Sequence, residues 1–161
     1  MPNNWLSVPH FRQELEYSCV AACARMVLAH YGDSRTEAEL RSLLDTRPAG
    51  TPARNVMHLS GPAFEVYVRP SNRGELRRAL ADNQPPIVFL QTGALEYWGL
   101  DIFHTAIVVG IDDETVALND SYFPTAPRTT SLQTFERAWA STGQLAAFVR
   151  PRAQPQRGAG G

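Results

Sequence analysis

The hydrophobic pattern along the chain changes near residue 63, from helical spacing to the alternation that is typical of strands. Residues 19–31 are apolar almost all the way round, which predicts a helix that is buried on every side. Ser18 stands where an N-cap is expected, and Gly32 stands where such a helix would end. The first strong element of the chain is therefore expected to be a core helix.

Two shorter helices are predicted after it. Thr36 and Glu39 have the spacing of a capping box, which places the start of a helix over residues 37–45. Thr51-Pro52 is a capping residue followed by proline, and proline is favoured at the first helical position. This pair predicts a third helix.

Strands dominate the second half of the pattern. Strands are predicted over residues 64–68, 87–90, 104–111, 115–119 and 145–149, and helices over 73–83 and 132–141. Because helices come first and strands gather late, the order predicts the α+β class, with an N-terminal helical half and a C-terminal antiparallel sheet. Residues 1–150 are expected to form one domain, and residues 151–161, rich in Gly, Pro and Arg, a solvated and flexible tail that ends in Gly-Gly.

Composition supports one globular domain and excludes several functions. The chain has 161 residues, of which 43% are hydrophobic and 19% charged, and its net charge is −1. This balance gives no electrostatic reason to expect a nucleic acid partner or an anionic membrane surface. All fifteen cationic side chains are Arg, so no lysine is available for Schiff-base or phosphate-loop chemistry.

The cysteines and the N-terminus favour a reducing compartment. No apolar run is long enough to span a bilayer, and the first residues lack the pattern of a secretory signal. Cys19 and Cys23 lie four residues apart on one predicted helix, a spacing typical of two thiols rather than a disulfide. We therefore expect a cytoplasmic protein.

Cys19 is the candidate nucleophile. It lies where the predicted core helix begins, and the unpaired amides and positive dipole end of a helix start favour a thiolate. A thiolate is the attacking species in covalent catalysis by cysteine. The alternative is a small buried hydrophobic residue, which is what most free cysteines are. Cys23, one turn further in, is expected in the core.

His104 and Asp120 are the candidate partners of this nucleophile. They lie sixteen residues apart, at the start of one predicted strand and just past the end of the next. A three-residue loop between the strands would place Asp120 opposite Ala106 and diagonal to His104, within reach of an imidazole–carboxylate hydrogen bond. A two-residue loop would put the pair on opposite faces of the hairpin. The alternative is a lone histidine and a turn aspartate.

Gln13, six residues before Cys19, is a further candidate for the catalytic site. Acyl transfer through a cysteine passes through an oxyanion, which side-chain amides and backbone N–H groups stabilise. Gln13 and the backbone N–H of Cys19 could supply two such donors. Taken alone, a glutamine in a loop is usually a surface residue.

These motifs resemble the C39 peptidases, papain-like cysteine proteases known for processing bacteriocin leaders after double glycine. Residues 13–32, QELEYSCVAACARMVLAHYG, are similar to the family's opening motif. Residues 104–110, HTAIVVG, and 118–120, LND, resemble its histidine strand and its aspartate motif. The order of the four residue types and both spacings agree with the family.

The resemblance implies a papain-like fold, a Cys19–His104–Asp120 triad, an oxyanion hole that contains Gln13, and no cofactor or metal. It implies a peptide or protein substrate, such as a leader peptide cut after Gly-Gly. The chain lacks the exporter segments of the best-known members, so a stand-alone form is expected. Many relatives have glycine after the nucleophile where this chain has Val20, which weakens the expectation of glycine specificity.

Aromatic residues near these motifs are the candidate substrate-binding residues. Tyr17 precedes the nucleophile, and Trp98 and Phe103 belong to a loop that leads directly into His104. Tyr97 lies in the same loop. The alternative for these side chains is ordinary packing beneath a long loop.

Three rival functions remain open from the sequence. An acyltransferase could use the same triad, because a thioester can react with an amine instead of water. A non-catalytic binder of leader peptides could share the fold. A metal site could draw on Cys19, Cys23, His10 or His30, although no second cluster has zinc-like spacing. The oligomeric state is not indicated.

Overall fold

The computed structural model describes residues 4–153. The helices are α1 (Cys19–His30), α2 (Glu37–Leu43), α3 (Arg73–Ala81) and α4 (Leu132–Ala140), with 3₁₀ segments η1 (Ala53–Leu59) and η2 (Thr92–Ala94). The strands are β1 (Phe64–Pro70), β2 (Ile87–Gln91), β3 (Phe103–Ile111), β4 (Thr115–Asn119), β5 (Arg128–Ser131) and β6 (Leu145–Pro151). Across residues 4–153, no helix combines the length and the apolar character that crossing a membrane requires.

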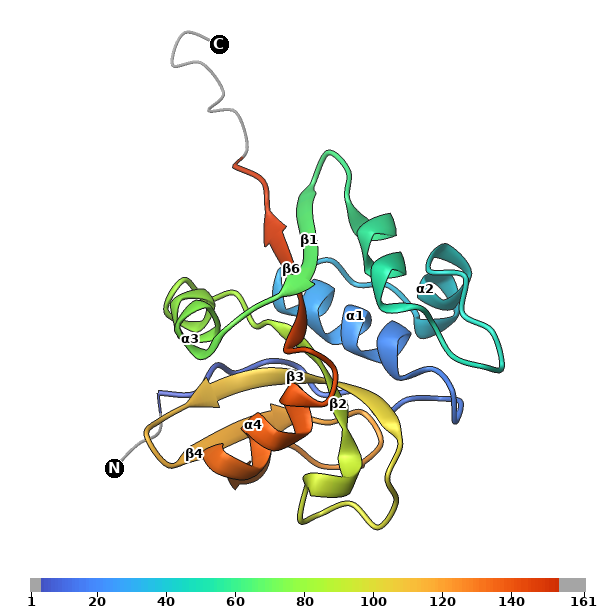
Figure 1. The fold of residues 1–161 in the computed structure, drawn as a ribbon. Coiled ribbons are helices and arrows are strands. Elements are labelled where there is room, and N and C mark those ends of the chain that lie inside the picture. Colours follow the sequence, from blue (N-terminus) through green and yellow to red (C-terminus); the bar gives the residue numbers. More distant parts are fainter. Residues whose placement is uncertain (1–3, 154–161) are drawn as a thin grey trace, which may run out of the picture.

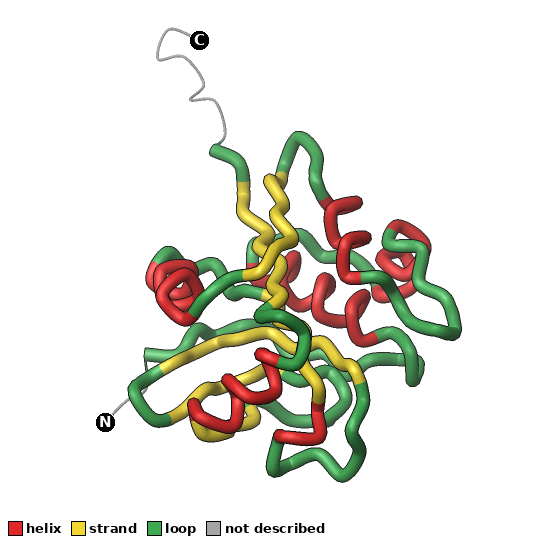
Figure 2. Tube along the Cα trace, in the orientation of Figure 1, coloured by secondary structure: helices red, strands yellow, loops and turns green. Residues whose placement is uncertain are grey.

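The six strands form one sheet in the order β1-β6-β2-β3-β4-β5. Every pair of neighbours is antiparallel, which confirms the predicted α+β class. Figures 1 and 2 show β1 and β6 as an upright pair above the crossing β3 and β4 hairpin. The sheet is therefore strongly twisted along its length, as neighbouring strands in open sheets are.

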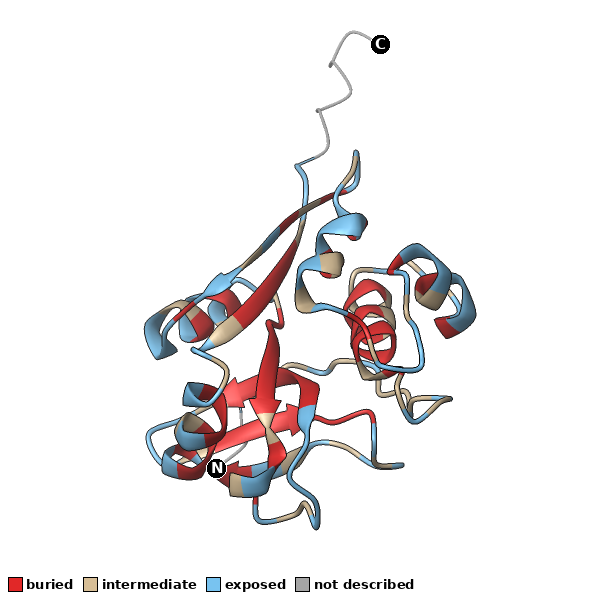
Figure 3. Ribbon diagram, turned by 45° about the vertical axis from the view of Figure 1, so that its right-hand side comes forward, coloured by how far each residue is buried: buried red, intermediate tan, exposed pale blue. Residues whose placement is uncertain are grey.

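Alternation along the central strands divides the core into two layers. Ile87 and Phe89 pack with α1, α2 and η1 on one face, whereas Val88 and Leu90 pack with α3 and α4 on the other. This is the two-residue period of a strand that is covered on both faces. Figure 3 shows the resulting buried centre of the sheet.

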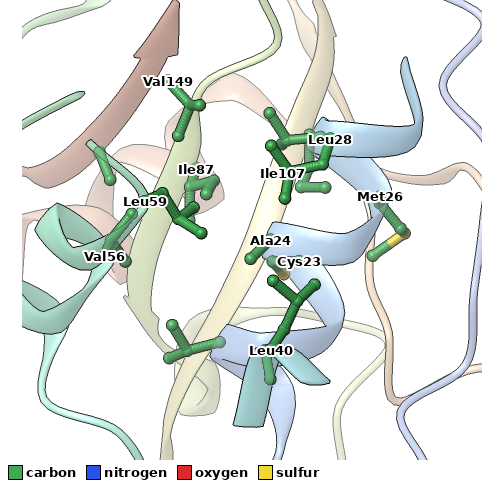
Figure 4. Packing of buried hydrophobic residues seen from close by; sticks show 14 of the residues in the cluster. Cys23, Ala24, Met26, Leu28, Leu40, Val56, Leu59, Ile87, Ile107 and Val149 are labelled. Carbon is green, nitrogen blue, oxygen red and sulfur yellow. The ribbon is translucent and has the colours of Figure 1, made fainter. Parts of the chain in front are cut away.

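Helix α1 is buried on nearly all sides, as its apolar composition predicts. Eight of its residues, from Val20 to Leu28, are buried. Figure 4 shows Cys23, Ala24 and Leu28 of α1 among sheet residues that include Ile107. The helix that carries Cys19 at its first position is thus fixed against the sheet.

Local sequence signals predicted most of the helix starts, but two elements of the structure differ from the prediction. Thr36 caps α2, because its Oγ1 accepts a hydrogen bond from Glu39 N at 3.1 Å. The helix expected after Thr51-Pro52 is a 3₁₀ segment, Ala53–Leu59. Strand β5 was not predicted, because its sequence RTTS lacks apolar alternation; it is an edge strand that pairs only with β4.

The chain stays paired beyond residue 150, where the tail was expected to begin. Pro151 is the last residue of β6 and lies opposite Phe64 of β1. Arg152 N donates to Ala63 O at 2.8 Å. The rest of the expected tail, with its Gly-Gly end, lies outside the described residues.

Candidate active site

The β3–β4 hairpin brings His104 and Asp120 together. Ile107 pairs with Asn119, which sets Asp120 opposite Ala106 and diagonal to His104. This is the predicted arrangement. Side chains in diagonal positions on one face are close enough for a long polar pair to meet.

The turn between the strands is the shorter of the two that the sequence left open. Asp112 N donates to Thr115 O at 2.9 Å, so the turn has two central residues and not three. Such a turn alone would put the pair on opposite faces. A register shift between Val108 and Gly110 inserts one extra residue and restores the parity. A side chain at Gly110 would collide with the ring of Trp5, so glycine allows the N-terminal segment to pack over the bulge.

His104 and Asp120 form a buried ion pair. His104 Nε2 donates to Asp120 Oδ1 at 2.7 Å, and the two side chains are 3% and 0% exposed. Burial would lower the pKa of His104, but its hydrogen bonds and charge interactions with Asp120 and Cys19 raise that pKa to about 9. Because Nε2 is held by Asp120, Nδ1 is the ring nitrogen left to serve Cys19.

Asp120 is held by four donors. Besides His104, its Oδ1 accepts from Tyr122 N at 3.1 Å, and its Oδ2 accepts from Trp98 Nε1 at 2.9 Å and Tyr97 Oη at 3.1 Å. Burial would raise the pKa of Asp120, but the hydrogen bond and charge of His104 and the other donors lower it. An asparagine would turn an NH₂ group toward the Trp98 indole N–H, which only donates, so a carboxylate suits this place.

Trp98, a candidate substrate-binding residue, contacts Asp120 and His104. Its indole N–H binds Asp120, and its ring lies edge-on to the His104 ring with the centroids 4.8 Å apart. Trp98 does not line the cavity beside Cys19, whereas Tyr17 and Phe103 both do. Trp98 and Tyr97 therefore position Asp120 and His104, and the sequence signal for this was only their place in the loop before His104.

Cys19 lies at the first position of α1 and lines one cavity together with His104. Its side chain is partly buried. Burial would raise the pKa of the thiol, but the hydrogen bond and positive charge of His104 outweigh it, with smaller contributions from Thr105, and lower the pKa. The arrangement can hold a thiolate beside an imidazolium.

Ser18 is the residue before the helix, but it does not cap α1. Its Oγ accepts from Leu15 N at 3.0 Å and donates to Leu15 O at 2.9 Å. Within residues 4–153, no other side chain takes over the cap, and the first helical bond is Ala22 N to Ser18 O. The N–H groups of the first turn, including that of Cys19, are left without a side-chain acceptor.

Cys23 is a core residue, as predicted. It is 0% exposed, and its Sγ donates to Thr105 O at 3.5 Å. Burial raises the pKa of this thiol well above its ordinary value. The pKa values of the two cysteines on this helix are therefore shifted in opposite directions.

Gln13 is hydrogen-bonded to Ser121, the neighbour of Asp120, but its side-chain amide is occupied. Gln13 N donates to Ser121 O at 2.7 Å, next to Asp120 in the chain. Its Nε2 donates to Leu15 O at 2.8 Å and Glu16 O at 3.1 Å, and its Oε1 accepts from Ser121 Oγ at 2.8 Å. Backbone carbonyls of the loop before Cys19 therefore engage the amide N–H groups of Gln13.

Glu37 is a buried carboxylate that the sequence reasoning did not single out. It is 1% exposed, and it accepts from Glu14 N at 2.9 Å and from Arg41 Nη1 at 3.0 Å. Burial raises its pKa. Glu37 thereby ties the loop between Gln13 and Cys19 to α2, and its i,i+4 spacing from Arg41 was the available signal.

The residues considered for a metal site have other partners. His10 Nε2 lies 2.7 Å from Phe123 O, and His30 Nε2 lies 3.1 Å from Asn83 O. In the part of the chain that the structure describes, no three His, Cys, Asp or Glu side chains converge as metal ligands do.

Three solved structures share this fold. A putative C39-like peptidase from Bacillus anthracis superposes with a TM-score of 0.73 at 14% identity, covering 93% of this chain and 98% of the other. The peptidase domain of Streptococcus ComA, a bifunctional ABC transporter in a quorum sensing pathway, gives 0.71 at 24% identity, covering 91% and 100%. A double glycine motif protease from an AMS/PCAT transporter, in complex with the leader peptide, gives 0.72 at 18% identity, covering 92% and 94%.

The predicted fold is therefore confirmed as that of C39 peptidase domains. None of the curated proteins compared with the chain matches it. The sequence model of the Peptidase_C39 like family matches residues 5–147, which is most of the chain. By this match the chain belongs to the Peptidase_C39 like family.

Proposed function

We propose that this protein is a cysteine peptidase in which Cys19, His104 and Asp120 act as the catalytic triad. The observation that carries the proposal is the chain of contacts at one cavity wall, from the half-buried Cys19 through His104 to the fully buried Asp120. His104 lowers the pKa of Cys19, and Asp120 raises the pKa of His104. A nucleophile, a base and an orienting acid in that order are what covalent acyl chemistry requires.

The reaction begins with the proton of Cys19 on His104. The thiolate attacks a peptide carbonyl carbon, and the electron pair of the carbonyl moves to its oxygen. As that oxyanion collapses, His104 gives its proton to the leaving amine, and the acyl group stays on sulfur as a thioester. Water, deprotonated by His104, then releases the acid and restores the thiol.

Two donors are proposed for the oxyanion. The Cys19 backbone N–H lies in the uncapped first turn of α1, where amides favour a negative charge. Gln13 provides the second donor through its side-chain amide, which would exchange its longer bond, to Glu16 O at 3.1 Å, for the oxyanion. Two bonds with Ser121 hold Gln13 next to Asp120.

A peptide is the proposed substrate, and a reducing compartment such as the cytoplasm the proposed place of work. The leader peptide bound by the AMS/PCAT protease of the same fold supports a peptide substrate. The resemblance to double-glycine peptidases makes a leader peptide one candidate, and the residues accepted beside the bond depend on the cavity at Cys19. Both cysteines are free thiols, which suits a reducing environment.

Digestion of a proteome-derived peptide mixture tests the proposal. Wild-type protein is expected to cut peptides that remain intact with the Cys19→Ala variant, as read by mass spectrometry of new termini. Adding a small primary amine separates hydrolysis from acyl transfer, because an acyltransferase would yield amide products. Identical peptide maps from the two proteins would remove the proposal.

Replacing Gln13 by alanine is expected to lower kcat by about 10²–10³-fold, since one oxyanion donor is lost. The alkylation rate of Cys19 should stay near that of the wild type, because alkylation forms no oxyanion. Gln133→Ala, on the exposed side of α4, is the matched control. If the Gln13→Ala variant turned over substrate at the wild-type rate, Gln13 would not be part of the oxyanion hole.

A further inference from the structure

A cavity of about 560 Å³ lies beside Cys19 and His104, which both line it. Ile102, Phe103 at the start of β3, and the loop over residues 45–52 between α2 and η1 also line it. The cavity is therefore continuous with the proposed catalytic residues. Any group that fills it must lie next to the bond that Cys19 attacks.

The lining of this cavity is mostly apolar. Its hydrophobic residues are Val20, Ala49, Pro52, Ile102 and Phe103. Ile102 and Phe103 are 40% and 50% exposed, so their apolar surface is open to a group that enters the cavity. The ligand that this lining would bind is therefore an uncharged apolar group.

The acidic and arginine side chains that line the cavity are exposed to solvent. Asp45 and Arg47 form an ion pair with each other at 3.0 Å, and their side chains are 59% and 72% exposed. Glu16, the other acidic lining residue, is exposed as well. Because Asp45 and Arg47 pair with each other in solvent, they provide no buried counter-ion for a charged ligand.

The loop wall is built before any ligand arrives. Arg47 N donates to Gly50 O at 3.1 Å and Gly50 N donates to Arg47 O at 2.7 Å, which closes a tight turn. Gly50 has a φ of 109°, a value that side chains disfavour. Thr46 Oγ1 and Thr51 Oγ1 lie 2.7 Å apart at the base of the turn. A wall that is already ordered loses little conformational entropy when a ligand binds.

We propose that this cavity binds a large uncharged apolar side chain of the substrate, of the size of Leu or Phe, within two residues of the scissile bond. This inference rests on the proposed cysteine peptidase function. A substrate with only glycine at these positions would leave the cavity without a side chain to fill it. Val20, which is 2% exposed and lines the cavity directly after Cys19, adds to the apolar surface.

Sequencing the cleavage sites of the peptide mixture tests the proposal. Large aliphatic or aromatic residues are expected to be enriched at one of the two positions on either side of the cut bond. In a matched pair of peptides that differ by Leu or Phe against Gly at that position, kcat/KM should be about 10–100-fold higher for the larger residue.

Ala49→Phe provides the second arm, because a phenyl ring on this exposed residue would occupy the cavity without disturbing the core. It is expected to remove most of the preference by slowing cleavage of the larger peptide, while the glycine peptide changes little. Ala140→Phe, the same change at an exposed residue of α4 away from the cavity, should keep the wild-type preference.

Two failures are distinguishable. Cleavage that depends on Cys19 but favours glycine, or a preference unchanged by Ala49→Phe, would overturn this inference and leave the peptidase proposal standing. A mixture in which no cleavage depends on Cys19 would overturn both.

Discussion

Replacing Cys19 by alanine is expected to reduce peptide cleavage by roughly 10⁶-fold, to the background rate, because no other group can form the acyl intermediate. The fold should survive, since Cys19 is only partly buried at the first position of α1. The measurement is kcat/KM on a peptide that the wild type cuts, together with the unfolding midpoint of each protein.

Cys23→Ala is the matched control on the same helix. Its sulfur is fully buried and touches only the core and Thr105 O, so its loss should cost about 1 kcal/mol of unfolding free energy and leave most of the activity. If the two substitutions exchanged these effects, or if Cys19→Ala kept its activity, the nucleophile would have been assigned to the wrong cysteine.

Replacing His104 by alanine is expected to lower kcat/KM by about 10²–10⁴-fold, because both the base for Cys19 and the acid for the leaving amine are lost. In the wild type, the active form pairs a thiolate with an imidazolium. Activity should rise with pH as Cys19 ionises, below the ordinary thiol pKa of 9.0, and fall as His104 loses its proton at a pKa of about 9.

His58→Ala is the control for this substitution. His58 is exposed, and its Nδ1 contacts Leu43 O at the surface, so its removal should leave the pH profile unchanged. A falling limb that persisted in the His104 variant would show that another group carries the proton.

The hairpin shows how far the sequence alone could reach. The sixteen-residue spacing and strand alternation would place Asp120 opposite Ala106 with a three-residue turn and on the other face with a two-residue turn. The turn has two central residues, and the bulge next to Gly110 nevertheless sets Asp120 opposite Ala106. Bulges depend on what packs against them, here the Trp5 ring, so a local pattern does not predict them.

Residues whose partners are distant in the chain were the hardest to assign. Trp98 looked like a pocket residue because it lies in an aromatic loop, but its N–H reaches Asp120 across 22 positions. Glu37 and Glu14 meet across 23 positions. The loop over residues 45–52 carries no motif, because it contributes to the cavity by lying in space near Cys19 and Phe103 and not through a characteristic residue pattern.

The family resemblance predicted the fold, whereas the chemistry of individual residues bears on specificity. The motifs around Cys19, His104 and Asp120 predicted the fold, which the solved relatives confirm at TM-scores above 0.7. The same resemblance implied glycine specificity, whereas the shape and lining of the cavity favour a larger side chain. Fold follows from the whole pattern, but specificity follows from a few side chains near the bond.

The most direct test of the thiolate–imidazolium pair is the pH dependence of Cys19 alkylation by iodoacetamide, followed by mass spectrometry of the intact protein. The wild type should be alkylated rapidly at pH 6, and the His104→Ala variant only at much higher pH, because burial then raises the thiol pKa against only the smaller contributions of Thr105. Equal alkylation curves for the two proteins, with midpoints near the ordinary thiol pKa of 9.0, would contradict the account.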